Sequence, residues 1–261
     1  MLKIGWFSTG NGEGSLGFIK YFLEYIHKNN LDISLEYVFV NREYGEHKGS
    51  DNFIDYLKIN KINIINLSSK KFKKENFNQP FYKYRREYDL EVENLISSYD
   101  TDLIVMAGYM LILSDILCNK FRFINLHPAL PKGPKGTWIN VIKYLISNNI
   151  TESGLNVHVV TNKLDAGKSI GYCNFSYGNS KQEWKEYYEL SKNSKKINYK
   201  NLKLFSLIRN QILDREKILL LCVIEEFLKN KHKLEDVFDD SNKLGLFKSI
   251  NYSSKIDALL S

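Results

Sequence analysis

The sequence predicts an α/β protein built on a doubly wound, mostly parallel sheet. Apolar runs typical of strands alternate with segments of helical apolar spacing through the first half of the chain. One run, Thr101–Ala107 (TDLIVMA), is apolar almost throughout, as expected for a strand buried on both faces of a parallel sheet. Polar residues follow several of these runs, at the edge where open α/β sheets bind ligands.

The first half of the chain divides into strand-then-helix units. The predicted strands are Leu2–Phe7, Ile33–Val40, Ile62–Leu67 and Thr101–Ala107. Helices are predicted after each of these strands. They run from Phe18 onward, over Asn52–Lys58, over Phe81–Ser98 and over Ser114–Lys120.

The second half predicts a helix, a hairpin and a long tail. Thr137–Ser147 has helical spacing, and the strands Gly154–Val160 and Ser169–Phe175 are joined by turn residues with Asp165 at the tip. Beyond position 178 the composition becomes charged and amphipathic, with a long helix from Leu202 to Lys231. We therefore expect a main domain over residues 1–178 and a helical C-terminal extension over residues 179–261 that packs on it.

Composition narrows the class of protein. The hydrophobic content of 43% supports a buried core, and the +7 charge comes from lysines spread along the chain, which favours a solvated surface or steering of small anions over nucleic-acid binding. The three cysteines show no metal or disulfide spacing, and no targeting or membrane-spanning run is visible. We expect a cytoplasmic monomer or homodimer without a metal, a membrane partner or a nucleic-acid partner.

The segment Phe123–Gly136 (FINLHPALPKGPKG) holds the most chemistry. Its three prolines cannot continue a strand ladder, so the strand must end near His127. Asn125 and His127 are two residues apart, so they point to the same side of the strand and can address one substrate. With Asp165 they supply an amide donor, a base and a carboxylate, a set that suits acyl transfer through an oxyanion.

A glycine-rich turn follows the first predicted strand. Gly10, Asn11 and Gly12 leave backbone N–H groups at the start of a helix, where phosphate binds readily. The turn is neither a dinucleotide fingerprint nor a Walker loop. Taken alone, it is equally compatible with phosphate binding and with an ordinary tight turn.

Three motifs together resemble a known family. The run INLHPALP, the later LDAG and the preceding AGYMLILS are similar, in order and spacing, to the folate-dependent formyltransferases, and most of all to those acting on phosphoribosylglycinamide. The resemblance covers roughly Lys3 to Phe175 and implies a Rossmann-like formyltransferase fold.

The resemblance also implies a reaction. A formyl group would pass from 10-formyltetrahydrofolate to the amine of a phosphorylated small molecule, glycinamide ribonucleotide of purine synthesis above all, without a metal or a covalent intermediate. Asn125 and His127 would hold the formyl oxygen and assist proton transfer, while Asp165 would set the charge of His127. His158 matches a second histidine beside the site.

Further residues match the family's binding regions. Gly10, Asn11, Gly12 and Arg85 correspond to the phosphate site, although Arg86 adjoins Arg85. The folate pocket corresponds to an apolar wall of Tyr109, Met110, Leu111, Ile112, Leu113 and Val160. The Leu130–Pro131 bond is cis in similar members, and this sequence leaves its geometry open.

Two departures concern the acceptor. The segment ALPKGPKGTW replaces the usual pattern after the His-Pro pair, and EGSLG reads as an insertion into the N-terminal loop. Both segments face the amine in the family. An amino sugar nucleotide, or another phosphorylated amine, is therefore an alternative acceptor, and a folate- or nucleotide-binding protein without turnover is the alternative outside enzymes.

Overall fold

A computed structural model describes residues 1–75, 81–193, 197–238 and 248–261. Its strands are β1 (Leu2–Ser8), β2 (Ile33–Val40), β3 (Ile64–Asn66), β4 (Leu103–Met106), β5 (Phe123–His127), β6 (Glu152–Val159), β7 (Ser169–Ser176) and β8 (Ile250–Asn251). They follow the order β3-β2-β1-β4-β5-β6-β7-β8 in the sheet. Parallel pairing of β1 with β2 and β4, and of β4 with β5, confirms the predicted fold class.

The helices alternate with these strands, as predicted. They are α1 (Glu13–Lys28), α2 (Lys48–Ile59), α3 (Ser69–Glu75), α4 (Phe81–Ile96), α5 (Asp115–Lys120), α6 (Trp138–Ser147), α7 (Lys181–Asn193), α8 (Lys203–Lys229), α9 (Lys231–Phe238) and α10 (Ser253–Leu260), with a short 3-10 turn at Tyr199–Asn201.

The described chain forms two compact units. Unit 1 comprises Met1–Asn125, Val159–Lys168 and Glu225–Lys243; unit 2 comprises Leu126–His158, Ser169–Ile224 and Leu244–Ser261. These units do not coincide with a division at residue 178. The division into a main domain over residues 1–178 and a helical extension over residues 179–261 therefore stays a prediction.

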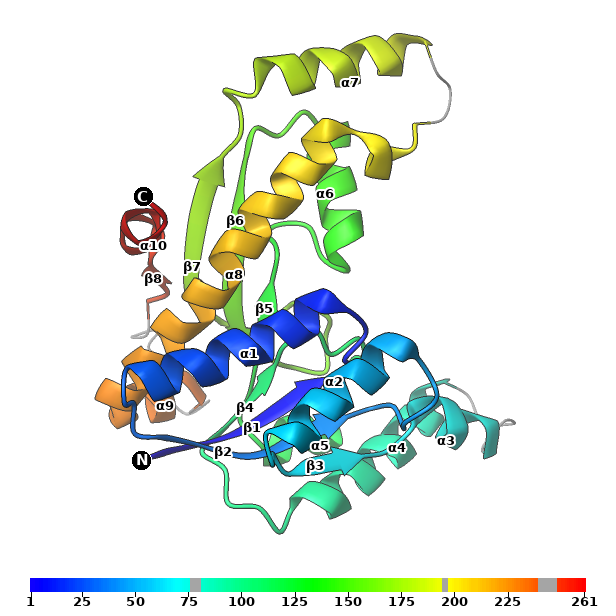
Figure 1. Ribbon diagram of the computed structural model, residues 1–261, viewed down its shortest axis with the longest axis vertical. Coiled ribbons are helices and arrows are strands. Elements are labelled where there is room, and N and C mark those ends of the chain that lie inside the picture. Colours follow the sequence, from blue (N-terminus) through cyan, green and yellow to red (C-terminus); the bar gives the residue numbers. More distant parts are fainter. Residues whose placement is uncertain (76–80, 194–196, 239–247) are drawn as a thin grey trace. The chain divides into compact units, whose positions relative to one another are not determined.

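Unit 1 is covered by helices on both faces of its strands. Trp6 of β1 packs against Phe18 and Phe22 of α1, with ring centroids 5.9 and 5.0 Å away. The next residue, Phe7, points to the other face, where it joins a core cluster with Tyr88 and other residues of α4 and α5. Figure 1 shows α1 beside α2, and α4 beside α5.

Unit 2 contains an antiparallel hairpin. β6 pairs with β7, as the turn residues around Asp165 predict, and β8 pairs in parallel with β7. Gly154 of β6 is required by close packing, because a Cβ there would lie 2.1 Å from the Cys173 carbonyl oxygen and 2.5 Å from Leu130 Cδ2. Leu130 therefore ties the proline-rich segment to this hairpin.

Several predicted boundaries are wrong. EGSLG is not a loop insertion, because Glu13 begins α1 and these residues form its first turn. The tail contains the predicted helices, and the two-residue strand β8, which was not predicted, adds to the sheet. Helix α3 was not predicted, because its lysine-rich sequence carries little apolar periodicity.

Other predictions are confirmed. The long helix of the tail exists as α8, and the strand before the proline-rich segment ends at His127. The Leu130–Pro131 bond, whose geometry the sequence leaves open, is trans. Within the described ranges, no helix combines the length and apolar character needed to cross a bilayer.

Candidate functional site

The predicted phosphate loop is a tight, cross-braced turn in unit 1. Gly10 adopts φ +64°, a left-handed conformation that favours glycine, and its N–H donates to Ser8 Oγ at 3.1 Å. Ser50 of α2 donates from Oγ to the Thr9 carbonyl at 3.0 Å. Gly12 directly precedes α1, so Gly10, Asn11 and Gly12 stand at the positive end of a helix dipole.

The same loop is joined to the predicted folate wall. The N–H of Met110 donates to Thr9 Oγ1 at 3.0 Å, and the N–H of Thr9 donates to the Gly108 carbonyl at 3.0 Å. Gly108 has φ +73°, and a Cβ there would lie 2.5 Å from Ser15 Oγ of α1. Two regions about 100 residues apart in sequence are therefore brought together by backbone contacts.

The wall alternates between buried and exposed side chains. Tyr109 and Leu113 are buried, and Leu111 and Val160 pack against the core cluster to which both belong. Met110 and Ile112 are 57% and 40% exposed. Met110 and Ile112 are therefore the two side chains of this wall that are most accessible to a ligand.

Arg85 is placed differently from a surface phosphate ligand. Its side chain is 6% exposed, and its Nη2 lies 3.1 Å from Asp89 Oδ1. Burial raises the pKa of Asp89, and the Arg85 guanidinium opposes that shift. Asp89 in turn accepts a hydrogen bond from the backbone N–H of Ser114, at the end of the wall. Arg86, by contrast, is half-exposed and pairs with Asp115.

His127 is held by the backbone of the segment that follows it in unit 2. Its side chain is buried, and its Nε2 lies 2.8 Å from the Pro134 carbonyl oxygen. Because a carbonyl oxygen only accepts, this contact requires a proton on Nε2. In the neutral ring Nδ1 is then the basic nitrogen.

A turn within the segment brings Pro134 back to His127. The Gly133 N–H donates to the Leu130 carbonyl at 2.8 Å, and Lys132 and Gly136 take positive φ values of 67° and 101°. The three prolines and these turn residues make a compact loop whose carbonyl oxygen faces the imidazole.

The structure also brings the two predicted histidines together. His158 of β6 is buried, and its ring centroid lies 6.3 Å from that of His127 at an interplanar angle of 77°. A second titratable ring therefore stands beside the first one.

Asn125 and Asp165 belong to unit 1. Asn125 is half-buried at the end of the β4–β5 pairing, opposite Met106. Asp165 is half-buried in the turn after β6 and has φ +45°, a left-handed conformation that aspartate tolerates better than most side chains. The Val159 N–H closes this turn by donating to the Lys168 carbonyl at 2.9 Å.

The part of the chain that the structure describes contains no cluster of metal ligands, and two of its cysteine thiols have raised pKa values. No three His, Cys, Asp or Glu side chains there come together in a way that could hold a metal ion. Burial raises the pKa of the Cys118 and Cys173 thiols to about 12, so both are inert at neutral pH.

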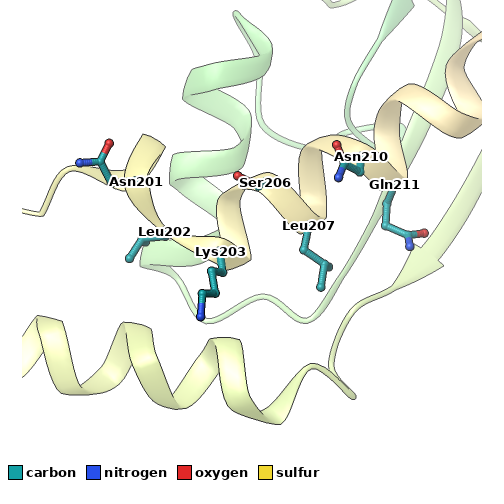
Figure 2. A pocket seen from close by; sticks show the side chains of 7 residues that line it. All are labelled: Asn201, Leu202, Lys203, Ser206, Leu207, Asn210 and Gln211. Carbon is teal, nitrogen blue, oxygen red and sulfur yellow. The ribbon is translucent and has the colours of Figure 1, made fainter.

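Two open pockets in unit 2 are lined by none of the predicted site residues. The first, of about 460 Å³ and drawn in Figure 2, follows the start of α8 and is lined by Asn201, Leu202, Lys203, Ser206, Leu207, Asn210 and Gln211. The second, of about 500 Å³, is lined by Thr151, Gly178, Lys181, Trp184, Lys185, Tyr188, Glu189 and Lys192. Neither contains a residue named for catalysis.

Comparison of the sequence with known families gives one match that spans the central residues. Residues 54–174 match the family described as formyl transferase. The matched region contains Asn125, His127, His158 and Asp165 in their predicted order. Residues 54–174 are therefore similar to the formyl transferase family over slightly less than half of the chain.

Curated proteins that are similar to this region carry related names. The phosphoribosylglycinamide formyltransferase of Escherichia coli is 36% identical over 88 residues, which cover 33% of this chain and 41% of that protein. The one from Dictyostelium discoideum is 29% identical over 174 residues, 62% of this chain and 77% of that protein. A bovine trifunctional purine biosynthetic protein is 32% identical over 95 residues, 36% of this chain but only 9% of that protein.

Solved structures share the fold of this chain over most of its length. Phosphoribosylglycinamide formyltransferase from Bacillus halodurans superposes with a TM-score of 0.62 at 17% identity, covering 88% of this chain and 96% of that one. A formyltetrahydrofolate deformylase from Pseudomonas syringae gives a TM-score of 0.61 at 18% identity, covering 88% and 62%. The fold is thus common to a formyltransferase and a deformylase.

Sequence reasoning missed residues that act through the backbone. Thr9 holds Met110, Ser15 fills the space at Gly108, and the Pro134 carbonyl meets His127. Only the glycine of AGYM gave a signal, because it permits the close approach of Ser15. A carbonyl oxygen has no side-chain signature at all.

Proposed function

We propose that this chain transfers the formyl group of 10-formyltetrahydrofolate to the primary amine of glycinamide ribonucleotide. The observation that carries the proposal is the His127 imidazole held by Pro134 inside a region of formyl transferase sequence. The names of the curated relatives favour the phosphoribosylglycinamide acceptor over other amines. An amino sugar nucleotide is the second candidate, because the loop Ala129–Gly136 departs from the pattern of similar enzymes.

The proposed chemistry needs no covalent enzyme intermediate. The lone pair of the neutral amine attacks the formyl carbon, and the carbonyl π pair moves onto the formyl oxygen. The Asn125 amide N–H donates to this oxyanion. Since the Pro134 carbonyl keeps one proton of His127 on Nε2, a second proton makes the ring a cation that donates to the oxyanion through Nδ1.

Collapse of the intermediate moves one proton. The bond between the formyl carbon and the folate nitrogen breaks, the former amine loses a proton, and the folate nitrogen gains one. Asp165 serves this transfer through water and favours the charged form of His127. The products are the formamide and tetrahydrofolate.

Binding follows from the two regions that Thr9 and Met110 join. The turn Gly10–Gly12 receives the acceptor's phosphate at the start of α1, and the exposed Met110 and Ile112 contact the pterin of the donor. Arg85 contributes positive charge near this region, or supports the wall through Asp89.

The test is formyl transfer measured with the full chain. Donor and glycinamide ribonucleotide are mixed with enzyme, and formamide product is followed against a panel of amino sugar nucleotides. Asn125→Ala and His127→Ala should each lower kcat by on the order of 10²–10³, because each removes a preorganised oxyanion donor. His232→Ala, which removes a side chain that is 98% exposed, is the matched control and should leave kcat unchanged.

Each alternative has its own outcome. Turnover of an amino sugar nucleotide with none of glycinamide ribonucleotide would replace the acceptor and keep the reaction. Donor consumption without an amine would indicate hydrolysis. Folate binding without turnover on any amine, or full activity of both Ala variants, would overturn the proposal.

A further inference from the structure

We infer that Arg209 of α8 is a positioning residue for His127, acting through Trp138 and the loop that carries Pro134. The kinetic effect that we expect rests on the proposed function. The contacts that support the inference all lie within unit 2. It gives the C-terminal helix α8 a role at the site.

The Pro134 carbonyl contacts the His127 ring from the loop that follows it. Pro134 accepts from Nε2 at 2.8 Å, so the position of this carbonyl sets the tilt and the protonated nitrogen of the imidazole. Pro134 has no side-chain hydrogen bond of its own to fix it. Its position depends on the two ends of the loop, at Leu130 and at Trp138.

The first end is fixed by packing on the hairpin. Leu130 Cδ2 lies against Gly154 of β6, at a distance that leaves no room for a Cβ. The Gly133 N–H closes a turn onto the Leu130 carbonyl at 2.8 Å. This packing and this hydrogen bond fix the Leu130 end of the loop.

The second end is fixed by α8. Thr137 caps α6 by accepting from the Asn140 N–H at 3.4 Å, and the next residue, Trp138, is four positions after Pro134. The Trp138 indole lies 5.9 Å from the Phe205 ring, and the Arg209 guanidinium carbon lies 4.4 Å from the Trp138 ring centroid. Phe205 and Arg209 are one helical turn apart, so α8 presents both to the same ring.

A contact with Glu216 holds Arg209 in this position. Its side chain is 21% exposed, and its Nη1 lies 3.7 Å from Oε2 of Glu216, whose side chain is 12% exposed. A stacked cation gains strength when it is partly desolvated. The chain of contacts therefore runs from Glu216 through Arg209 and Trp138 to the loop of Pro134.

The same helix offers a matched control. Arg215 also lies over an aromatic ring, 5.2 Å from the centroid of Phe175, and also pairs with a carboxylate, Asp257, at 3.1 Å. Its ring partner belongs to β7 and not to the proline-rich loop. Removing Arg215 therefore loses an equivalent cation without touching Trp138.

The experiment compares Arg209→Met, Arg209→Lys and Arg215→Met in the full chain by hydrogen exchange and by NMR titration of the His127 ring. Met keeps most of the stem volume and removes the planar cation. We expect amides between Lys135 and Asn140 to exchange about 5-fold to 10-fold faster in Arg209→Met than in the wild type. The titration midpoint of His127 should shift in the same variant, and Arg215→Met should change neither observable.

Arg209→Lys separates positioning from simple loss of charge. Lysine keeps the charge but lacks the planar fork, so we expect an intermediate exchange rate. A double variant, Trp138→Leu with Arg209→Met, should exchange no faster in this segment than Trp138→Leu alone, because both changes break one contact chain. This pair also keeps the test valid if one variant is poorly folded.

Kinetics then tie the loop to the reaction. In Arg209→Met we expect kcat to fall about 10-fold with KM for the donor nearly unchanged, because a tilted ring loses transition-state contact. Unchanged exchange and an unchanged His127 titration in Arg209→Met, or equal changes in Arg215→Met, would overturn the inference. A wild type without formyl transfer would instead overturn the proposed function, since the exchange and titration results stand without turnover.

Discussion

Glu216 makes the stability of this protein depend on pH in a calculable way. It lies on α8 with 12% of its side chain exposed, and burial raises its pKa from 4.5 to about 7 against the opposing attraction of Arg209. The folded state therefore holds this proton more tightly than the unfolded chain does. The resulting stabilisation is fully present below about pH 4.5 and is lost as pH rises through about 7.

The perturbation is Glu216→Gln, which keeps the size of the side chain and removes its titration. At 1.36 kcal/mol for each pKa unit, the change from 4.5 to about 7 corresponds to at most roughly 3 kcal/mol of unfolding free energy. As the pH rises from about 5 to about 8, the unfolding free energy of the wild type should fall by up to this amount relative to that of the variant. At about pH 5 the two proteins should differ little, because the wild-type carboxyl is then mostly protonated.

Urea unfolding followed by circular dichroism at both pH values measures this difference. Glu189→Gln is the control, because its carboxylate is 65% exposed and its partner Lys185 is 3.9 Å away, where solvent screens the pair. The control should follow the wild type at both pH values. Parallel behaviour of Glu216→Gln and the wild type across this range would refute the assignment of a proton to buried Glu216.

Three further predictions concern unit 1, each measured by thermal unfolding. Gly108→Ala should destabilise by about 1–2 kcal/mol, because φ +73° strains any side chain, and adding Ser15→Ala should restore part of the loss by removing the 2.5 Å contact. Asp89→Ala should cost about 3–5 kcal/mol, because it leaves the Arg85 guanidinium buried without its carboxylate. His47→Ala should cost about 1 kcal/mol, because His47 Nδ1 accepts from Gly49 at the start of α2; an unchanged midpoint in any of the three would contradict its reason.

The sheet was predictable because its signal is distributed over many residues. Thr101–Ala107 could hardly be anything but a buried strand, and β4 occupies Leu103–Met106 in the middle of the sheet. The three prolines after His127 forced the chain out of the sheet at the residue where β5 ends. These patterns depend on apolar periodicity and on covalent restrictions, both of which are local.

Helix starts and single contacts were harder to predict for the opposite reason. EGSLG carries two glycines and one apolar residue, so its sequence favours a loop, yet it continues α1 because the helix already packs on Trp6 through Phe18 and Phe22. The two-residue strand β8 has no periodicity to detect, and it exists because β7 offers an edge. Tertiary contacts decided both cases.

Arg85 illustrates why residue type alone does not assign a role. The motif RREYD predicts an arginine at the phosphate, but the fold surrounds this one with Tyr88 and Asp89 and leaves the neighbouring Arg86 half-exposed. A buried guanidinium fixed by a carboxylate that also holds the Ser114 backbone can shape the folate wall without touching a ligand. Arg85 can therefore act either by contacting a phosphate or by supporting the wall. Binding measurements on Arg85→Met, made with the donor and the acceptor separately, would distinguish these two roles.

The departure of Ala129–Gly136 from the usual pattern has a structural reading in unit 2. The loop contributes the Pro134 carbonyl to His127, and any sequence that folds back in the same way can do so. The backbone path of the loop places this carbonyl, and that path includes the turn at Gly133, the positive φ of Gly136 and the trans Leu130–Pro131 bond. Lys132 and Lys135 of this loop are exposed, so they add positive charge to its surface without being needed to place the carbonyl.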